Sequence, residues 1–165
     1  MSKKTIKISL EFEEYSSMNQ LAKEEKKLLS SAKQSLKKAY APYSNFHVGA
    51  AVLLDNSEII CGNNQENAAF PSGLCAERVA IFFANAIHPK RKIKSLAITC
   101  NSLNQEVTKP LSPCGSCRQV ISETEQRQKN KIRIIMSGNS GKVLICNGIE
   151  NLLPLMFKGE FLSNK

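Results

Sequence analysis

The chain has 165 residues, of which 42% are hydrophobic and 22% are charged, and its formal net charge is +9. This size and composition are typical of one folded domain with a substantial core. The longest mostly apolar run, residues 79–87, is too short to span a bilayer, so no membrane partner is expected. The first residues lack the long apolar stretch of a secretory signal, which predicts a cytoplasmic protein with reduced cysteines.

The positive charge raises the question of a nucleic-acid partner, because basic chains attract polyanions. Much of the excess lies in the first forty residues, which are rich in lysine. Glu24 and Glu25 interrupt this run, and no aromatic residues are interleaved with it. The pattern therefore favours a solvated helix face, and we expect no nucleic acid to bind.

Residues 5–12 alternate apolar and polar side chains, which predicts a short strand or an extended arm. We therefore treat residues 1–20 as an N-terminal extension and 21–165 as the main domain. From residue 21 the apolar spacing becomes helical, and the helix is expected to end before Pro42. Two β-like runs, 46–54 and 58–61, then flank a hairpin turn at residues 55–57.

After polar loops at 62–67 and 70–74, the remaining chain alternates helices and strands. These are helices at 75–87, 115–126 and 150–156, and strands at 93–99, 132–136 and 143–146. The order predicts one α/β domain of three layers, α/β/α, with a mixed and roughly five-stranded sheet between the helices.

Three cysteines fall at the predicted starts of two of these helices: Cys75 on one, Cys114 and Cys117 on the other. Unpaired backbone N–H groups and the helix dipole stabilise thiolates at such positions. Cys114 and Cys117 lie one turn apart and can bind the same ion. Three protein ligands with an open fourth position are typical of hydrolytic zinc, whereas four ligands are typical of structural zinc. We find no convincing fourth ligand and predict one Zn²⁺ per chain.

Charged residues beside these ligands fit the same chemistry. Zinc can lower the pKa of a bound water to about 7, and Glu77, two residues from a ligand, can accept its proton. Three thiolates and one Zn²⁺ sum to a net charge of −1. We expect Arg78 and Arg118, each next to a ligand, to donate hydrogen bonds to the sulfurs and offset that charge.

The alternatives at this stage are a structural zinc site and a redox dithiol, which uses the same spacing as Cys114 and Cys117. The other cysteines and both histidines are interpreted as structural. Cys61, Cys100 and Cys146 lie at the ends of apolar strands and are expected to be core residues. His47 lies in a predicted strand and His88 at the end of a helix.

Four motifs, in this order, resemble the small homotetrameric cytidine deaminases. They are residues 41–51 (APYSNFHVGAA), 64–68 (NQENA), 75–78 (CAER) and 113–120 (PCGSCRQV). The resemblance implies hydrolytic deamination of cytidine and deoxycytidine to uridine or deoxyuridine and ammonia, in pyrimidine salvage. It also implies a homotetramer with shared active sites. The three-ligand zinc site with a glutamate that is not a ligand is the chemistry of nucleobase deaminases as a class.

The resemblance further assigns roles to individual residues. Glu77 protonates N3 of the cytosine and then delivers a proton to the departing amine. Five substrate contacts are implied: Phe46 against the pyrimidine, Asn64 and Glu66 on the ribose 3′ hydroxyl, the backbone N–H of Ala76 on ring O2, and the carbonyl of Ser112 on the amine. Phe157 is the position that reaches into a neighbouring subunit's site. Many members have Tyr where this chain has Phe70, so a contact from that hydroxyl to the substrate of a neighbouring subunit would be missing.

Three rival functions remain open. A deaminase of a nucleoside-like antibiotic such as blasticidin S shares the cysteine and glutamate pattern, but Phe46 and the 64–67 motif favour cytidine. A deaminase of tRNA or another polynucleotide usually has a His-x-Glu pattern where this chain has Cys75 and Glu77. A zinc-binding module without enzymatic activity would show no turnover.

Overall fold

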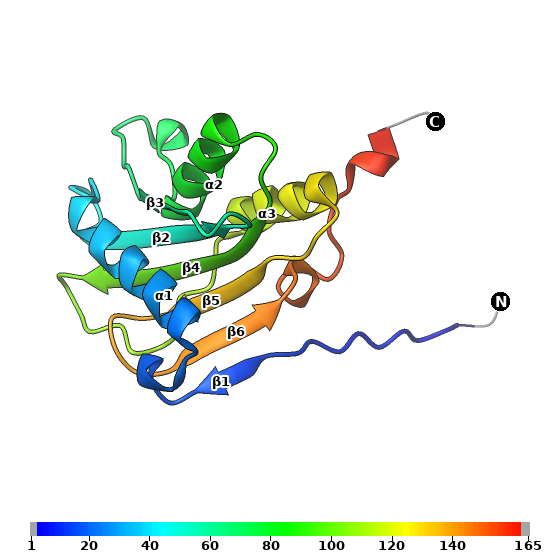
Figure 1. Cartoon of the computed structure of the whole chain (residues 1–165), viewed down its shortest axis with the longest axis horizontal. Helices are drawn as coiled ribbons and strands as arrows, with labels where there is room; N and C mark the ends of the chain where they lie inside the picture. The colour runs from blue at the N-terminus through cyan, green and yellow to red at the C-terminus, as the bar shows by residue number, and fades with distance from the viewer. Residues whose placement is uncertain (1–2, 163–165) are drawn as a thin grey trace.

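The computed structural model describes residues 3–162. Within them a mixed sheet of six strands has the order β1-β6-β5-β4-β2-β3 (Figure 1). The strands are β1 Glu13–Tyr15, β2 Phe46–Leu54, β3 Ile59–Asn63, β4 Ile93–Ser102, β5 Arg133–Ser137 and β6 Val143–Asn147. The α-helices are α1 Lys23–Ser35, α2 Ala76–Ile87 and α3 Gly115–Gln128. None of the described helices is long and apolar enough to cross a membrane.

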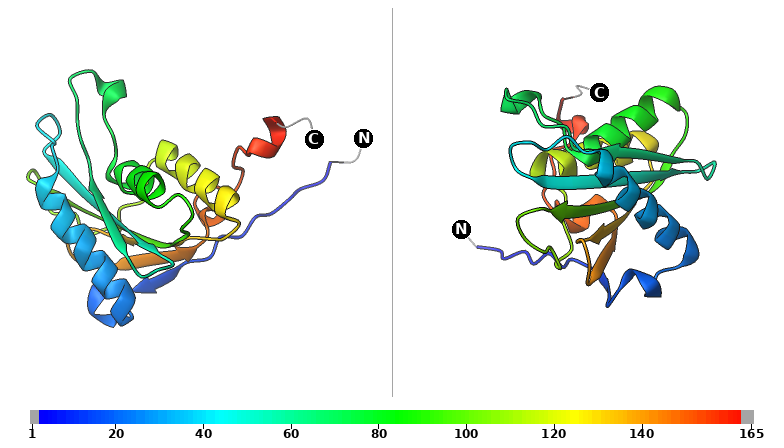
Figure 2. Two further views of the ribbon diagram at one scale, coloured as in Figure 1. Left: turned by 45° about the horizontal axis from the view of Figure 1, so that its top comes forward. Right: turned by 90° about the vertical axis from the view of Figure 1, so that its left-hand side faces the viewer.

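The predicted three-layer α/β/α arrangement is confirmed. Helix α1 covers one face of the sheet, and α2 and α3 cover the other (Figure 2). Leu28 and Leu29 of α1 pack with one core cluster, and Ala80 and Ile81 of α2 and Ile121 of α3 pack with the other. Strands β4 and β5 run parallel and α3 connects them, whereas the other paired strands run antiparallel.

The expectation of about five strands is wrong because the N-terminal extension supplies a sixth. No strand forms within the predicted range 5–12; the strand lies directly after it, at Glu13–Tyr15, at the edge of the sheet beside β6. Glu13 lies opposite Ile145, and β6 ends at Asn147, so residues before about 11 have no strand beside them. Residues 3–12 therefore continue β1 as an extended arm.

The first helix ends earlier than Pro42 requires. Helix α1 ends at Ser35, and a 3-10 turn, Leu36–Lys38, leads to extended backbone at Ala39. The reason is tertiary, since the Tyr40 N–H donates to the carbonyl of Asn64 and the Tyr40 carbonyl accepts from the Glu66 N–H. This pairing fixes the loop that carries Asn64 and Glu66.

The predicted helix at 150–156 is wrong. Only a 3-10 turn, Ile149–Asn151, forms there. Pro154 has no N–H to donate to the carbonyl four residues earlier, and its ring would clash with that carbonyl. The chain therefore leaves the turn in irregular conformation. The other strands and the helices α2 and α3 lie where the sequence pattern predicts them.

A glycine on β3 sets how closely α2 approaches the sheet. A Cβ at Gly62 would lie 2.5 Å from the carbonyl oxygen of Ala76 and 2.5 Å from the amide nitrogen of Ala80. Both atoms belong to the backbone of α2, so neither can move without the helix. Gly62 therefore determines the position of the helix start that carries Cys75 and Glu77.

We expect Gly62→Ala to lower the free energy of unfolding by about 1–3 kcal/mol, because the added methyl group overpacks the contact between β3 and α2. Urea denaturation followed by circular dichroism measures the change. Gly159→Ala is the matched control, since a Cβ there meets no atom within 4 Å. Equal midpoints for the two variants would contradict this account of the α2 position.

Candidate active site

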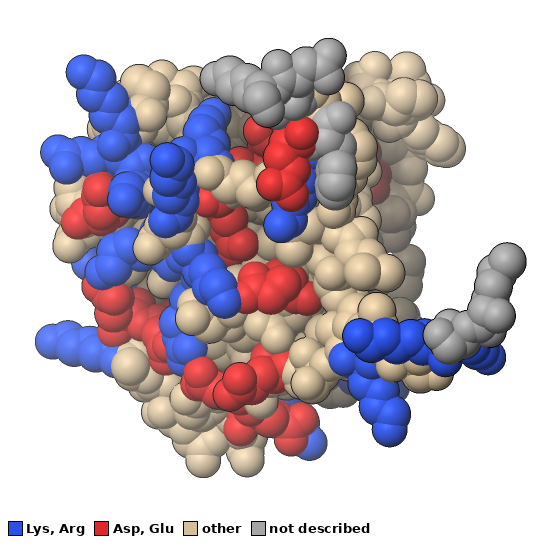
Figure 3. Space-filling view, turned by 90° about the vertical axis from the view of Figure 1, so that its right-hand side faces the viewer, with Lys and Arg blue, Asp and Glu red and all other residues tan. Residues whose placement is uncertain are grey.

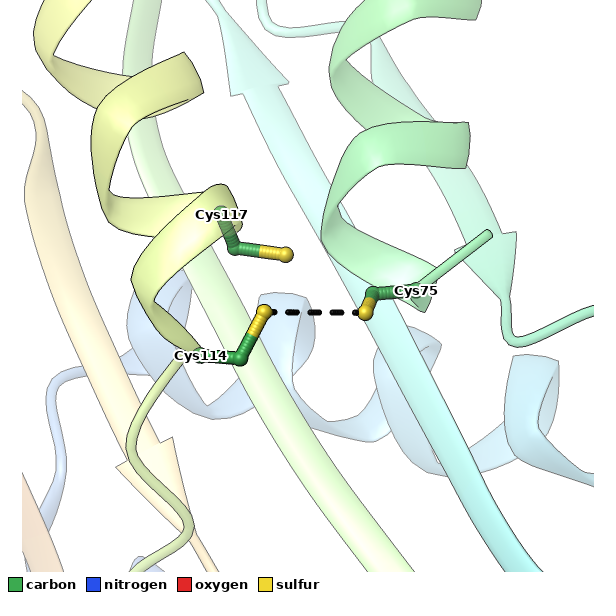
Figure 4. Close-up of side chains that lie close together, drawn as sticks. All are labelled: Cys75, Cys114 and Cys117. Atoms are coloured by element: carbon green, nitrogen blue, oxygen red, sulfur yellow. Dashed lines mark hydrogen bonds between the residues drawn. The ribbon is translucent and has the colours of Figure 1, made fainter. Parts of the chain in front are cut away.

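The three cysteines predicted to bind metal come together at the starts of α2 and α3 (Figure 4). Cys75 is the N-cap residue of α2 and Cys114 is the N-cap residue of α3, and Cys117 lies in the first turn of α3. Neither N-cap sulfur accepts a capping hydrogen bond. Cys117 is buried, Cys75 is partly buried and Cys114 is exposed, so the cluster opens on one side.

The sulfur positions fit zinc. The three Sγ atoms lie within 4.8 Å of one another, and those of Cys75 and Cys114 are 3.7 Å apart. A tetrahedral ion with Zn–S bonds of about 2.3 Å places its sulfurs about 3.8 Å apart. Among residues 3–162, the cluster contains no fourth histidine, cysteine or carboxylate ligand. The donor set thus matches three thiolates with one position left for water.

Hydrogen bonds and a nearby positive charge favour the thiolate form of Cys75, whereas the same hydrogen bond to Cys75 raises the pKa of Cys117. The Cys117 thiol, through its hydrogen bond to Cys75, has the largest effect; with help from Arg78, it lowers the pKa of Cys75 to about 5 despite burial. Arg78 Nη2 lies 3.8 Å from Cys75 Sγ and also donates to the carbonyl of Gly73 at 3.2 Å. The expected contact from Arg78 to a ligand sulfur is therefore present.

Arg118 makes no hydrogen bond of the expected kind to a ligand sulfur within the described chain. Its guanidinium donates to the carbonyl of Pro113 at 2.9 Å, to the carbonyl of Leu152 at 2.7 Å and to Ser112 Oγ at 2.9 Å. These bonds direct its nitrogens toward oxygen atoms rather than sulfurs. Arg118 instead joins the loop before α3 to the C-terminal segment, and so helps to hold Ser112 in place.

Glu77 lies in the first turn of α2 and is only 4% exposed. Among the residues that the structure describes, it is the one charged side chain that is buried. Burial raises the pKa of its carboxyl group above the ordinary value. Burying a carboxyl group costs free energy unless it is hydrogen-bonded or paired, and buried groups with perturbed pKa values concentrate at functional sites.

A cavity of about 600 Å³ opens beside Glu77 and the cysteines. Most of the residues that the sequence assigns to the site line it: Phe46, Asn64, Glu66, Cys75, Glu77, Arg78, Ser112 and Cys114. Ala76 and Cys117 lie fully buried behind this lining. Arg118 and Phe157 do not line it.

The two residues assigned to the ribose also have structural contacts. Asn64 Oδ1 accepts from the N–H of Val48 at 2.8 Å, and Asn64 Nδ2 donates to the carbonyl of Phe46 at 2.9 Å. The Glu66 carboxylate accepts from the Tyr43 N–H at 2.9 Å and from the Ser44 hydroxyl and N–H. The Ser44 hydroxyl has the largest effect in lowering the pKa of Glu66. Both side chains are therefore held rigidly at the cavity wall.

Sequence reasoning did not assign several residues that line the cavity. They include Tyr43, Ser44, Leu74 and Leu111, and Phe70, noted above for its missing hydroxyl, also lines the cavity. Tyr43 and Ser44 belong to the 41–51 motif, and this was the available signal for them. Tyr43 packs edge-to-face on Phe70 with ring centroids 6.1 Å apart, and Phe70 is 75% exposed.

The other three cysteines and the two histidines, interpreted above as structural, lie mostly where that interpretation places them. Cys100 and Cys146 are buried, but Cys61 is exposed, so its assignment to the core is wrong. His88 caps the C-terminal end of α2, the opposite end from Cys75, and its Nε2 lies 2.9 Å from a carboxylate oxygen of Glu58. His47 lies on β2. Phe157 is 55% exposed, and its carbonyl accepts from Gln119 Nε2 at 2.9 Å.

Comparison with known proteins is consistent with this geometry. Residues 22–131 match the family described as the cytidine and deoxycytidylate deaminase zinc-binding region. A cytidine deaminase of Sporosarcina psychrophila is 43% identical over 97 residues, which is 59% of this chain and 67% of the relative. The crystal structure of a cytidine deaminase from Burkholderia pseudomallei superposes with a TM-score of 0.69 at 36% identity, covering 79% of this chain and 97% of that one. A blasticidin-S deaminase of Bacillus cereus is 30% identical over 114 residues, 67% of this chain and 76% of the relative.

Cys114→Ser is expected to lose bound zinc while the protein remains folded, because it removes one thiolate from a three-thiolate site and Cys114 is exposed. Metal content per chain, measured by atomic emission on purified protein, should be near one ion for the unmodified chain and far below one for the variant. Cys61→Ser is the matched control, since it removes an exposed thiol outside the cluster. Full zinc content in Cys114→Ser would overturn the three-sulfur assignment.

Proposed function

This chain belongs to the cytidine and deoxycytidylate deaminase family, and on that premise we propose how its residues carry out the reaction. It is a hydrolase that deaminates cytidine, releasing ammonia and leaving uridine. The observation on which the residue assignments depend is the position of one buried carboxyl group, that of Glu77, in the same cavity as the sulfur cluster.

The three thiolates of Cys75, Cys114 and Cys117 would hold one zinc ion per chain. When bound, the ion would act as a Lewis acid that lowers the pKa of a water molecule to about 7. Arg78 stabilises the thiolate charge through Cys75. Glu77 accepts the proton from the attacking water and transfers it to N3 of the cytosine ring. Glu77 then takes the remaining proton from the hydroxyl group now on C4 and passes it to the departing amine as the C4–N bond breaks, so that ammonia leaves and a carbonyl oxygen remains on C4.

The rest of the cavity holds the nucleoside. Phe46 packs against the pyrimidine, and the carbonyl of Ser112 accepts a hydrogen bond from the amine. The backbone N–H of Ala76, the first residue of α2, has no partner within its helix and binds ring O2. Asn64 and Glu66 hydrogen-bond the ribose 3′ hydroxyl. Beside the contacts that hold these side chains, Asn64 keeps one amide N–H to donate and Glu66 keeps carboxylate lone pairs to accept.

Deoxycytidine is proposed as a second substrate, and pyrimidine salvage in the cytoplasm as the setting. All six cysteines are free thiols in the structure, which suits a reducing compartment. A deaminase of a nucleoside-like antibiotic is the second candidate, supported by the 30% identity to a blasticidin-S deaminase. Comparing kcat/KM for cytidine and for blasticidin S on the same protein distinguishes the two functions.

We further propose a homotetramer with shared active sites. Apolar side chains that favour association are exposed on α2, where Phe82, Phe83 and Ile87 are 47%, 53% and 44% exposed. In this assembly Phe157 would reach the site of a neighbouring subunit rather than its own, which accords with its absence from the cavity lining of its own chain.

Glu77→Gln is expected to bind zinc and fold normally but to lose about a hundred- to ten-thousand-fold in kcat, because an amide cannot shuttle protons. The decrease in ultraviolet absorbance as cytidine becomes uridine measures the rate. Glu123→Gln, at an exposed position on α3, is the matched control and should keep full activity. Near-normal turnover by Glu77→Gln would contradict the assignment of Glu77 as the proton carrier.

The shared site predicts complementation between two inactive variants. Phe157→Ala and Glu77→Gln should each be impaired, yet co-expressed chains should recover activity, since some hybrid sites combine Glu77 of one chain with Phe157 of another. Activity above the sum of the separate variants, in a species of about four times 18.3 kDa by light scattering, is expected. A fully active monomer, or hybrids no better than their parents, would refute shared sites.

A further inference from the structure

An extended arm projects from the sheet ahead of β1. Residues 3–12 leave the body as a single extended segment, visible at the N-terminal end in Figure 1 and in both views of Figure 2. Within the described chain, no hydrogen bond joins the backbone of residues 3–10 to the body. The root is fixed, because the Glu11 N–H donates to Asn151 Oδ1 at 2.9 Å. Arg133 also binds the Glu13 carboxylate through two nitrogens, at 2.7 and 2.8 Å.

One face of this arm is apolar and exposed. Ile6, Ile8, Leu10 and Phe12 are 78%, 54%, 49% and 36% exposed. Side chains two residues apart on an extended chain point to the same side, so these four form one stripe. The outer edge of β1 is also unpaired, because β1 is the terminal strand of the sheet. A long, apolar, unpaired edge is a template for pairing with another strand.

We propose that this arm pairs antiparallel with the same arm of a second copy of the chain, with Ser9 opposite Ser9 of the second copy. Because backbone donors alternate sides along a strand and the Glu11 N–H faces the body, even-numbered residues present their N–H groups outward. Opposite residues must then have the same parity, which keeps both apolar stripes on one face of the ribbon.

Charge complementarity selects this register. It places Lys7 opposite Glu11 twice, by symmetry, while Ile6 meets Phe12 and Ile8 meets Leu10. Sliding one arm by two residues in one direction sets Lys4 opposite Phe12 and leaves Lys7 opposite Ser9. Sliding it in the other sets Ile6 opposite Glu14, and Lys7 then faces Glu13, whose carboxylate Arg133 already binds. Figure 3 shows basic side chains on the projecting N-terminal arm, while basic and acidic side chains are mixed on the body.

Arm pairing is separate from catalysis. The family match begins at residue 22, so the arm lies outside the matched region. The two-fold axis passes through Ser9, which leaves the two bodies at opposite ends and on opposite sides of the ribbon. Pairing therefore neither requires nor excludes contacts through α2, and its test stands whether or not the chain deaminates cytidine.

Cross-linking tests the register. In the proposed ribbon the two Ser9 Cα atoms form a non-hydrogen-bonded pair about 4.5 Å apart, within the range of about 4.4–6.8 Å for a disulfide. The two Lys7 Cα atoms are offset by four residues, about 13 Å. Under mild oxidation Ser9→Cys should therefore give a covalent dimer on non-reducing gels, about threefold or more above Lys7→Cys. The unmodified chain gives the background from its own cysteines.

Charge reversal provides the second test, with Ser9→Cys as the reporter. Adding Lys7→Glu should lower the dimer yield about threefold or more, because glutamate then faces Glu11. Adding both Lys7→Glu and Glu11→Lys should restore it, because the pair is reversed but still complementary. Equal yields for Ser9→Cys and Lys7→Cys, no Ser9→Cys dimer above background, or no rescue by the double reversal would each overturn the proposal.

Discussion

The starts of α2 and α3 point at the same place, and the sulfur atoms that they carry lie within 4.8 Å of one another. Each helix start brings unpaired N–H groups and the positive end of a dipole to the cluster, which stabilises three nearby thiolates. The helices can meet only because the sheet holds them side by side on one face and Gly62 lets α2 approach closely. The metal site is thus a product of helix packing as much as of cysteine spacing.

The same packing accounts for the buried carboxyl group. Glu77 follows the α2 ligand Cys75 by two residues, so a helix start placed to bind metal also places a carboxyl group beside the cavity. The opposite wall is held by backbone pairing between Tyr40 and the loop at 64–66. Asn64 and Glu66 are engaged with the backbone of neighbouring segments, so the cavity is shaped before any nucleoside enters it. A rigid wall of this kind reduces the entropy that binding must overcome.

The N-terminal segment has a different physical character from the rest. Residues 13–15 complete the sheet as strand β1, and two hydrogen bonds from Arg133 to the Glu13 carboxylate fix them there. Ahead of them the arm has the alternation of a strand but no strand beside it, because β6 has already ended, and only its last residues approach the body near Asn151. An exposed stripe of this kind is a liability in a lone molecule, and pairing between copies would remove it.

The amino-acid pattern alone determined the three-layer class, the helix starts at Cys75 and Cys114, and the family resemblance, because these depend on local periodicity and on short motifs. Other features depend on contacts between segments far apart in the chain, which a local pattern does not contain. The sixth strand required β6 as a partner, Arg118 turned to the C-terminal segment because the Leu152 carbonyl lies within reach, and Ser44 reached Glu66 only through the fold. The tertiary structure alone decided which further side chains share the cavity, such as Leu74 and Leu111, since the distance between two residues in space is set by how the sheet and helices pack.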